Sequence, residues 1–267
     1  MSHITCHDIK VYYELNGSGF PLLFISGLGA GTWSWEQQIP FFRRDFQVIT
    51  FDNRGAGQGS APQGPYSIEQ RALDTVRLLH SLQIKELFVV GLSMEGMIAQ
   101  ELALLLPHRI RGLVLAATHA GGNMRIPGSQ EVYDRLMDNM GMSPEEIVDK
   151  NITLLMGEST RKGHPEILKA YRRQQSEIPE QAEHAFVAQQ AAIQGFDAAA
   201  HLKKIKAPTL LLAGDEDRLI PMDNARCMAE HIPNSRVEIM KGAGHLLHLE
   251  QPERFNQTLL EFFQDQP

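Results

Sequence analysis

The sequence predicts an α/β protein, a mostly parallel central sheet flanked by helices, with a helical cap inserted into it. Short apolar runs rich in β-branched residues alternate with segments of helical periodicity, which is typical of strand–helix units. This alternation stops near residue 120 and resumes near residue 205. The 267 residues, 43% of them hydrophobic and 21% charged, suffice for one packed domain. We therefore expect a core from residues 1–120 and 205–267 and a helical cap from residues 121–204.

Most of the expected strands are continuous apolar runs, as in a sheet that is covered on both faces. The segment between the first two, Asn16 to Gly19, is rich in turn residues and favours a hairpin or a tight connection. The runs that predict strands are residues 9–15, 21–27, 46–52, 86–92, 109–118, 207–215 and 235–240.

Two helices of the core are marked by their first residues. Residues 67–82 show helical periodicity, and Ser67 is suited to cap that helix at its N-terminus. Residues 252–263 predict a closing helix, because Pro252 is tolerated in a first helical turn. The expected buried face of the first helix consists of Ile68, Ala72, Val76 and Leu79.

The cap segment has helical stretches at residues 131–140, 164–175 and 179–193 and no convincing strand. It also holds several of the methionines, whose flexible thioethers suit an adaptable apolar pocket but serve equally well as packing between helices. These are Met124, Met137, Met140, Met142 and Met156.

Charge and composition exclude several classes of partner. The formal net charge is −7, so we expect no general attraction to nucleic acid or to anionic membranes. The N-terminus lacks the pattern of a secretory signal, and the most apolar window, residues 87–107, is interrupted by Glu95, Gln100 and Glu101. Two cysteines, Cys6 and Cys227, form no disulfide framework. The expected location is the cytoplasm, without a membrane span.

The strand at residues 86–92 leads directly into Ser93 and then into a helix-like run. A serine hydroxyl is a weak nucleophile, so it needs a strained turn that exposes it, a neighbouring base and amides that receive negative charge. Gly91 and Gly96 on either side allow the strand and the helix to come close. Ser93 is therefore the candidate nucleophile.

Here the sequence resembles the α/β-hydrolase superfamily, whose elbow is G-x-S-x-G. Glu95 occupies the position of the second glycine, and Gly96 follows one residue later. The resemblance covers nearly the whole chain and is closest to 3-oxoadipate enol-lactonase-like and carboxylesterase-like members. It implies the α/β-hydrolase fold with a helical cap.

The resemblance extends to the loops that supply the acid and the base. Residues 214–221 are similar to the family's G-x-x-D-x-x-x-P loop, and this match selects Asp217. Asp215 and Glu216 are alternatives, and a solvated acidic loop is another. His245 ends a glycine-rich loop, residues 241–245, and follows the acid in the order that this fold uses. His248 reads as structural support.

The loop after the strand at residues 21–27 resembles the one that supplies the family's oxyanion hole. By this match the backbone N–H groups of Leu28 and Met94 are the donors, and no side chain is required. Ser26 stands where the family usually has histidine. The glycine-rich residues 51–60 lack a Walker lysine and resemble a structural loop of the family through Asp52, Arg54, Gly55 and Gly57, which argues against nucleotide binding.

Three residues are candidates for the substrate pocket: Trp33, His119 and Met124. Each has a structural alternative. Trp33 and Trp35 could pack against the helix after the oxyanion loop, and Met124 could pack between helices. His119 could be a polar residue at the base of the cap whose hydrogen bonds are satisfied there.

Glu95 is the main departure from the family pattern. A carboxylate in the first turn of a helix is favoured by about 0.3–1 kcal/mol, whereas a charge about 4 Å from the reacting centre would oppose an oxyanion by about 4 kcal/mol. We therefore expect Glu95 to point away from the oxyanion, paired or solvated.

The resemblance implies a serine hydrolase that cleaves a small carboxylic ester or lactone through an acyl-enzyme, with no metal and no organic cofactor. The same scaffold supports C–C bond hydrolases and haloperoxidase-like proteins. A catalytically weak, ligand-binding relative is the alternative from another class, because Glu95 interrupts the elbow. A homo-oligomer is left open.

Overall fold

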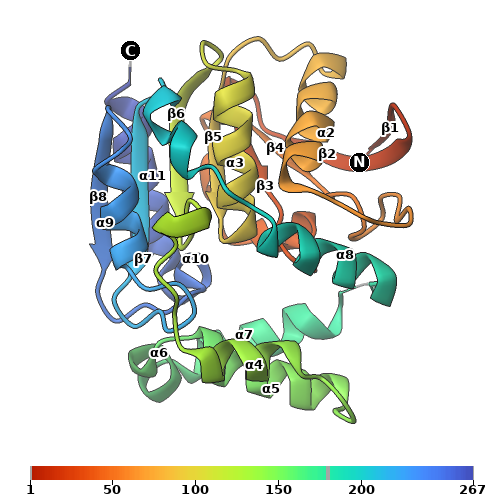
Figure 1. The fold of residues 1–267 in the computed structure, drawn as a ribbon, viewed down its shortest axis with the longest axis vertical. Helices are drawn as coiled ribbons and strands as arrows, with labels where there is room; N and C mark the ends of the chain where they lie inside the picture. Colours follow the sequence, from red (N-terminus) through yellow and green to blue (C-terminus); the bar gives the residue numbers. More distant parts are fainter. Residues whose placement is uncertain (1, 179–180, 267) are drawn as a thin grey trace.

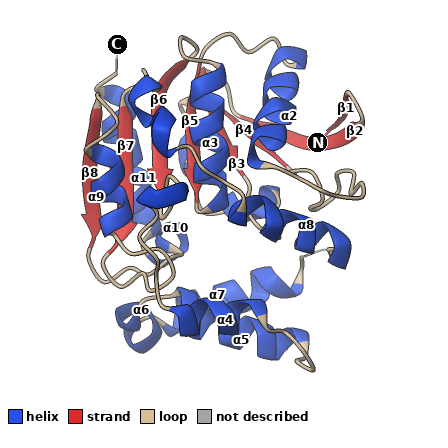
Figure 2. Ribbon diagram, in the orientation of Figure 1, coloured by secondary structure: helices blue, strands red, loops and turns tan. Residues whose placement is uncertain are grey.

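The protein contains one sheet with helices on both faces (Figures 1 and 2). The computed structural model describes residues 2–178 and 181–266. The sheet has eight strands in the order β1-β2-β4-β3-β5-β6-β7-β8, of which β1–β2 and β2–β4 pair antiparallel and all other neighbours pair parallel. The predicted mostly parallel sheet is thus confirmed. The strands are β1 (Ser2–Cys6), β2 (Ile9–Asn16), β3 (Phe20–Ile25), β4 (Phe46–Phe51), β5 (Leu87–Leu92), β6 (Ile110–Ala116), β7 (Thr209–Gly214) and β8 (Ser235–Met240).

The N-terminal edge of the sheet differs from expectation. Strand β1 was not predicted, because its residues are mostly exposed and polar, as is usual for an edge. The hairpin alternative for Asn16 to Gly19 is wrong, since β4 lies between β2 and β3. A Cβ atom at Gly17 would lie 2.2 Å from the carbonyl oxygen of Arg43, so this connection passes directly against the chain that precedes β4.

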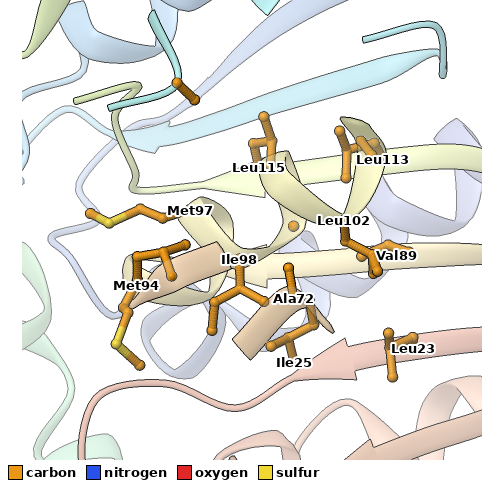
Figure 3. Close-up of a cluster of buried hydrophobic side chains, with 14 of the residues drawn as sticks. Leu23, Ile25, Ala72, Val89, Met94, Met97, Ile98, Leu102, Leu113 and Leu115 are labelled. Atoms are coloured by element: carbon orange, nitrogen blue, oxygen red, sulfur yellow. The ribbon is translucent and has the colours of Figure 1, made fainter. Parts of the chain in front are cut away.

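Side chains that alternate along the strands build two separate cores. Leu23 and Ile25 of β3 face α2 (Ile68–Ser81) and α3 (Met94–Leu105), in the cluster that Figure 3 shows. Leu22 and Phe24 of the same strand belong to the cluster on the opposite face, with α1 (Ile39–Phe42) and α11 (Pro252–Gln264). Successive strand residues point to opposite faces, so a sheet covered on both sides needs an unbroken apolar run.

The two predicted core helices are present. Ser67 caps α2, accepting a hydrogen bond from the backbone N–H of Gln70 at 3.0 Å. Ile68, Ala72 and Leu79 are buried as expected, while Val76 is only partly buried. Pro252 lies in the first turn of α11.

The chain between β6 and β7 is helical. Its described residues form no strand, only an isolated bridge between Gly121 and Asp197. In Figure 1 α4 to α7 lie together, set apart from the sheet, and α8 lies nearer to the core. The predicted stretches did not include α5 and α6. The helices are α4 (Gln130–Met137), α5 (Pro144–Leu155), α6 (Glu158–Gly163), α7 (Pro165–Ser176) and α8 (Glu183–Gln194).

No helix in the described ranges is long and apolar enough to cross a membrane. The carboxyl ends of parallel strands meet at one edge of a sheet, where α/β proteins place their sites. In this protein the loops that follow β3, β5, β7 and β8 meet at this edge of the sheet, together with α10 (Leu247–Glu250).

Candidate active site

Three residues from three loops form one chain of hydrogen bonds. The Nε2 atom of His245 lies 3.0 Å from the Oγ atom of Ser93, and its Nδ1 atom lies 2.8 Å from Oδ2 of Asp217. His245 and Asp217 are both buried, with 4% and 7% of their surface exposed. The three residues that the sequence singled out are therefore together, in the geometry of a nucleophile, a base and an orienting acid.

Ser93 adopts a backbone conformation that non-glycine residues rarely adopt. Its φ is 62° and its ψ is −122°, between the end of β5 and the first turn of α3. Close packing on both sides holds this turn: a Cβ atom at Gly91 would lie 2.3 Å from the carbonyl oxygen of Glu95, and one at Gly96 would lie 2.6 Å from Thr118. Thr118 also donates a hydrogen bond of 2.7 Å to the carbonyl oxygen of Ser93. The strained turn is thus built by the fold around it.

Asp217 is held by its own loop. Its Oδ1 atom accepts hydrogen bonds from the backbone N–H groups of Leu219 and Ile220, both at 2.9 Å, which leaves Oδ2 for the histidine. The alternatives have other partners: Asp215 accepts from the N–H of Gly242 at 2.7 Å, and Glu216 accepts from Ser159. Asp217 is the acidic residue of this loop that contacts His245.

The two backbone groups expected to bind an oxyanion are available. No hydrogen bond between described residues uses the N–H of Leu28 or of Met94. Met94 begins α3, and its side chain is buried as part of the cluster in Figure 3, so only its backbone is offered to the site. Amides at the start of a helix are suited to receive negative charge.

A cavity of about 560 Å³ opens at Ser93, between the loops of the core and the cap helices. Trp33 lines it, and Trp35, which is buried and donates from Nε1 to the carbonyl oxygen of Ile25 at 3.0 Å, contributes to its wall. Its apolar lining comes mainly from Leu28, Leu136, Met137, Ile147, Leu155, Ile178, Phe186 and Leu219. Its neutral amides are Asn139, Asn151, Gln174, Gln175 and Gln181.

Two of the pocket candidates lie outside this lining. His119 is buried, accepts a hydrogen bond at Nδ1 from the N–H of Gly121 at 3.1 Å, and has its pKa lowered to about 4 by burial. It is the satisfied polar residue of the structural alternative. Met124 packs instead against the core cluster that contains α2 and α3. Met137, one helix further along, is the methionine of the cap that lines the cavity.

The expectation that Glu95 is paired or solvated is wrong. Its side chain is neither solvated nor paired as expected: it is 5% exposed, and its Oε2 atom has no hydrogen-bond partner among the described residues. It lies against Gly27, in the loop of the oxyanion donors, where a Cβ atom would come within 2.0 Å of Oε1. Burial raises the pKa of Glu95 to about 8, although Arg71 opposes this shift. A pKa of about 8 favours the neutral acid near pH 7, which weakens the repulsion expected of a carboxylate.

The charge of Glu95 is therefore expected to limit activity at high pH. The acid is neutral below its pKa of about 8 and becomes an anion above it, where it opposes the developing oxyanion. At a separation of about 10 Å and an effective dielectric of 20, the repulsion between two unit charges is about 1.7 kcal/mol, which corresponds to more than tenfold in rate. In a profile of kcat/KM against pH, the wild type should lose activity above about pH 8.

The matched variant is Glu95→Gln, which keeps the shape of the side chain and cannot ionise. Its profile should stay level where the wild type falls. The same alkaline fall in both proteins would assign the titration to another group.

Cap residues that sequence reasoning missed support the oxyanion loop. Gln189 on α8 accepts a hydrogen bond from the N–H of Gly29 at 3.0 Å, and Gln174 on α7 donates one to the carbonyl oxygen of Trp33 at 3.0 Å. Glutamine is common on helix surfaces, so no sequence signal distinguishes these two.

The glycine-rich loop after β4 is structural. Asp52 accepts hydrogen bonds from the N–H groups of Thr32 and Gln58, both at 2.8 Å, and Arg54 binds Asp74 at 2.8 Å. These groups satisfy one another within the chain, as expected of a structural loop.

A serine on a strained turn after β5, an acid after β7 and a histidine after β8, on a mostly parallel sheet, define the class of α/β hydrolases. The chain belongs to the alpha/beta hydrolase family, whose pattern it matches over residues 22–258.

Individual relatives span almost the whole chain. 3-Oxoadipate enol-lactonase 2 of Acinetobacter baylyi is 29% identical over 96% of this chain and 94% of its own length. The poly(3-hydroxyalkanoate) depolymerase of Ectopseudomonas oleovorans is 33% identical over 92% of this chain and 85% of its own. Among solved structures, a thermophilic esterase from Thermogutta terrifontis superimposes with a TM-score of 0.82 at 29% identity, covering 98% of this chain and 97% of its own. The family and the fold are shared, while the names describe different substrates.

Proposed function

We propose that the protein is a serine hydrolase that cleaves a small, uncharged carboxylic ester or lactone through an acyl-enzyme. The observation that carries this proposal is the hydrogen-bond chain from Ser93 through His245 to Asp217. Ser93 and His245 line a cavity, and two unused backbone N–H groups lie beside Ser93. Relatives named as an enol-lactonase and an esterase support the choice of ester chemistry.

In this mechanism Ser93 Oγ attacks the carbonyl carbon while His245 Nε2 takes the hydroxyl proton. Asp217 keeps the other proton of the imidazole on Nδ1 and stabilises the imidazolium. The N–H groups of Leu28 and Met94 bind the oxyanion, where loss of one donor typically costs about 3–4 kcal/mol. His245 then protonates the leaving alcohol, and water activated by the same imidazole releases the acid.

The lining of the cavity favours an uncharged substrate. Among the described residues it contains no lysine and no arginine, and its ionisable residues are Glu95, Glu183, Tyr171 and two histidines. Lys150 is not among the lining residues, and its ammonium group donates to the carbonyl oxygen of Asp138 and to Oδ1 of Asn139, both at 2.6 Å. Burying a carboxylate without a paired cation costs several kcal/mol. An anionic acyl chain would therefore bind poorly.

The test compares two esters of one chain length, methyl p-nitrophenyl adipate and the mono-p-nitrophenyl ester of adipic acid. We expect kcat/KM to be about 100-fold higher for the uncharged diester, since about 3 kcal/mol of unpaired burial corresponds to that ratio. Initial rates of nitrophenolate release measure both.

Gln175 on the cavity wall provides the control. Gln175→Lys should narrow the ratio by raising kcat/KM for the anion, whereas Gln175→Met should leave the preference in place. Equal rates for both esters in the wild type would contradict the assignment to uncharged substrates without affecting that of a hydrolase.

A further inference from the structure

Glu250 is a buried carboxylate that the mechanism does not use. It ends α10, five residues after His245, and is 3% exposed. Its Oε1 atom accepts a hydrogen bond from the N–H of Gly244 at 2.9 Å. Its Oε2 atom accepts from the N–H of Gly157 at 2.8 Å and from Oγ1 of Thr160 at 2.7 Å. One carboxylate thus joins the residue before the histidine to the link between α5 and α6 of the cap.

The backbone makes the same connection. The N–H of His245 donates to the carbonyl oxygen of Leu155, the last residue of α5, at 2.7 Å. The two segments touch so closely that a Cβ atom at Gly244 would lie 2.5 Å from the backbone nitrogen of Gly157. Glycine at this position is required by the contact between the segments.

The acid loop is held by the same part of the cap. Glu216 accepts hydrogen bonds from Oγ and N–H of Ser159 at 2.8 and 3.1 Å, and Arg218 donates to the carbonyl oxygen of Thr153 at 2.7 Å. Both residues flank Asp217. Residues 153–160 therefore contact the chain next to the acid and next to the histidine, and we call them the cap brace.

We infer that the cap brace sets the position of His245 relative to Ser93, and that Glu250 is the positioning residue that fastens it. This inference rests on the proposed function. The side chain of Leu155 lines the cavity, so one residue contacts the substrate space and, through its carbonyl oxygen, the backbone of the catalytic histidine. The part of the cap that meets the substrate is thereby continuous with the catalytic loops.

A positioning role differs from simple support in what it changes. A misplacement of about 1 Å can cost about 100-fold in rate while substrate binding is little affected. Loss of folding stability alone would lower the melting temperature and the fraction of active enzyme, and would leave kcat per active site unchanged. Titration of active sites with a fluorophosphonate separates these cases.

The experiment uses Glu250→Gln, which keeps the size of the side chain and replaces one acceptor oxygen by a donor. With an uncharged p-nitrophenyl ester we expect kcat per active site to fall by about 10- to 100-fold and KM to change by less than about 3-fold. Thr160→Val, which removes one of the hydrogen bonds to Glu250, should cause a smaller loss of kcat. This variant replaces Glu250→Gln as the test if Glu250→Gln does not fold. In the double variant the losses should be less than multiplicative, because both act through one contact.

The matched control is His184→Ala, which removes a different contact between cap and core, the 3.0 Å hydrogen bond to the carbonyl oxygen of Ala61. It should leave kcat unchanged. An equal loss in the control, or unchanged kcat in both test variants, would overturn the inference.

A second readout does not need turnover. The proton between His245 Nδ1 and Asp217 should give a downfield ¹H resonance, and His245→Ala would assign it by its disappearance. Glu250→Gln should shift or broaden this resonance, and His184→Ala should not. If no ester were hydrolysed, the proposed function would fail, but this spectrum would still test the role of the cap brace. An unaltered resonance in Glu250→Gln would refute the inference about the cap brace.

Discussion

Replacing Ser93 by alanine is expected to lower kcat on a p-nitrophenyl ester by about a millionfold. The variant keeps the oxyanion donors and the cavity but lacks the oxygen that forms the acyl-enzyme. The positive φ of Ser93 is imposed by the packing of Gly91 and Gly96, so alanine should occupy the same turn without disrupting the fold. Steady-state kinetics and circular dichroism would measure the two expectations separately.

Covalent labelling provides the control for this prediction. A fluorophosphonate should label the wild type, fail to label Ser93→Ala, and label an exposed-site variant such as Glu131→Gln normally. His245→Ala should also lose turnover, because no base remains to take the serine proton. A folded wild type that is not labelled would contradict the hydrolase and favour the ligand-binding alternative.

Asp217→Asn is expected to lower kcat by about ten thousandfold while the fold stays intact. The reason lies in the hydrogen bonds of the loop. The N–H groups of Leu219 and Ile220 hold Oδ1, so the amide oxygen of asparagine takes that place and its NH₂ group faces His245. His245 then accepts at Nδ1 and carries its proton on Nε2, where it cannot receive the proton of Ser93.

The neighbouring acid gives the comparison. Asp215→Asn changes an exposed carboxylate that bonds Gly242 rather than the histidine, so kcat should stay near the wild-type value. Its effect on stability should be within about 0.5 kcal/mol, as is usual for surface substitutions. Similar losses in both variants would mean that the loop as a whole, rather than Asp217, orients the imidazole.

The sheet and the three hydrogen-bonded residues were predictable because their signals are local. Parallel strands buried on both faces are continuous apolar runs, and the loops at Ser93, Asp217 and His245 have fixed neighbours such as Gly91 and Gly244. Strand β1 gave no such signal, because an exposed edge strand has no apolar run.

The errors concern the surroundings of single side chains, which the sequence does not show. His119 follows β6 at the correct edge of the sheet, but its ring accepts a hydrogen bond from Gly121 of its own loop. The environment of Glu95 depends on Gly27, and the role of Glu250 depends on Gly157 and Thr160. The identity of an acidic residue does not show whether its side chain is solvated, neutral in a core or hydrogen-bonded to a distant helix.

The contact between Glu95 and Gly27 also makes these two positions depend on each other. The carboxyl group occupies the volume that a side chain at position 27 would need, so any residue other than glycine there would displace the carboxyl group. A substitution at either of the two positions should therefore alter the surroundings of the other.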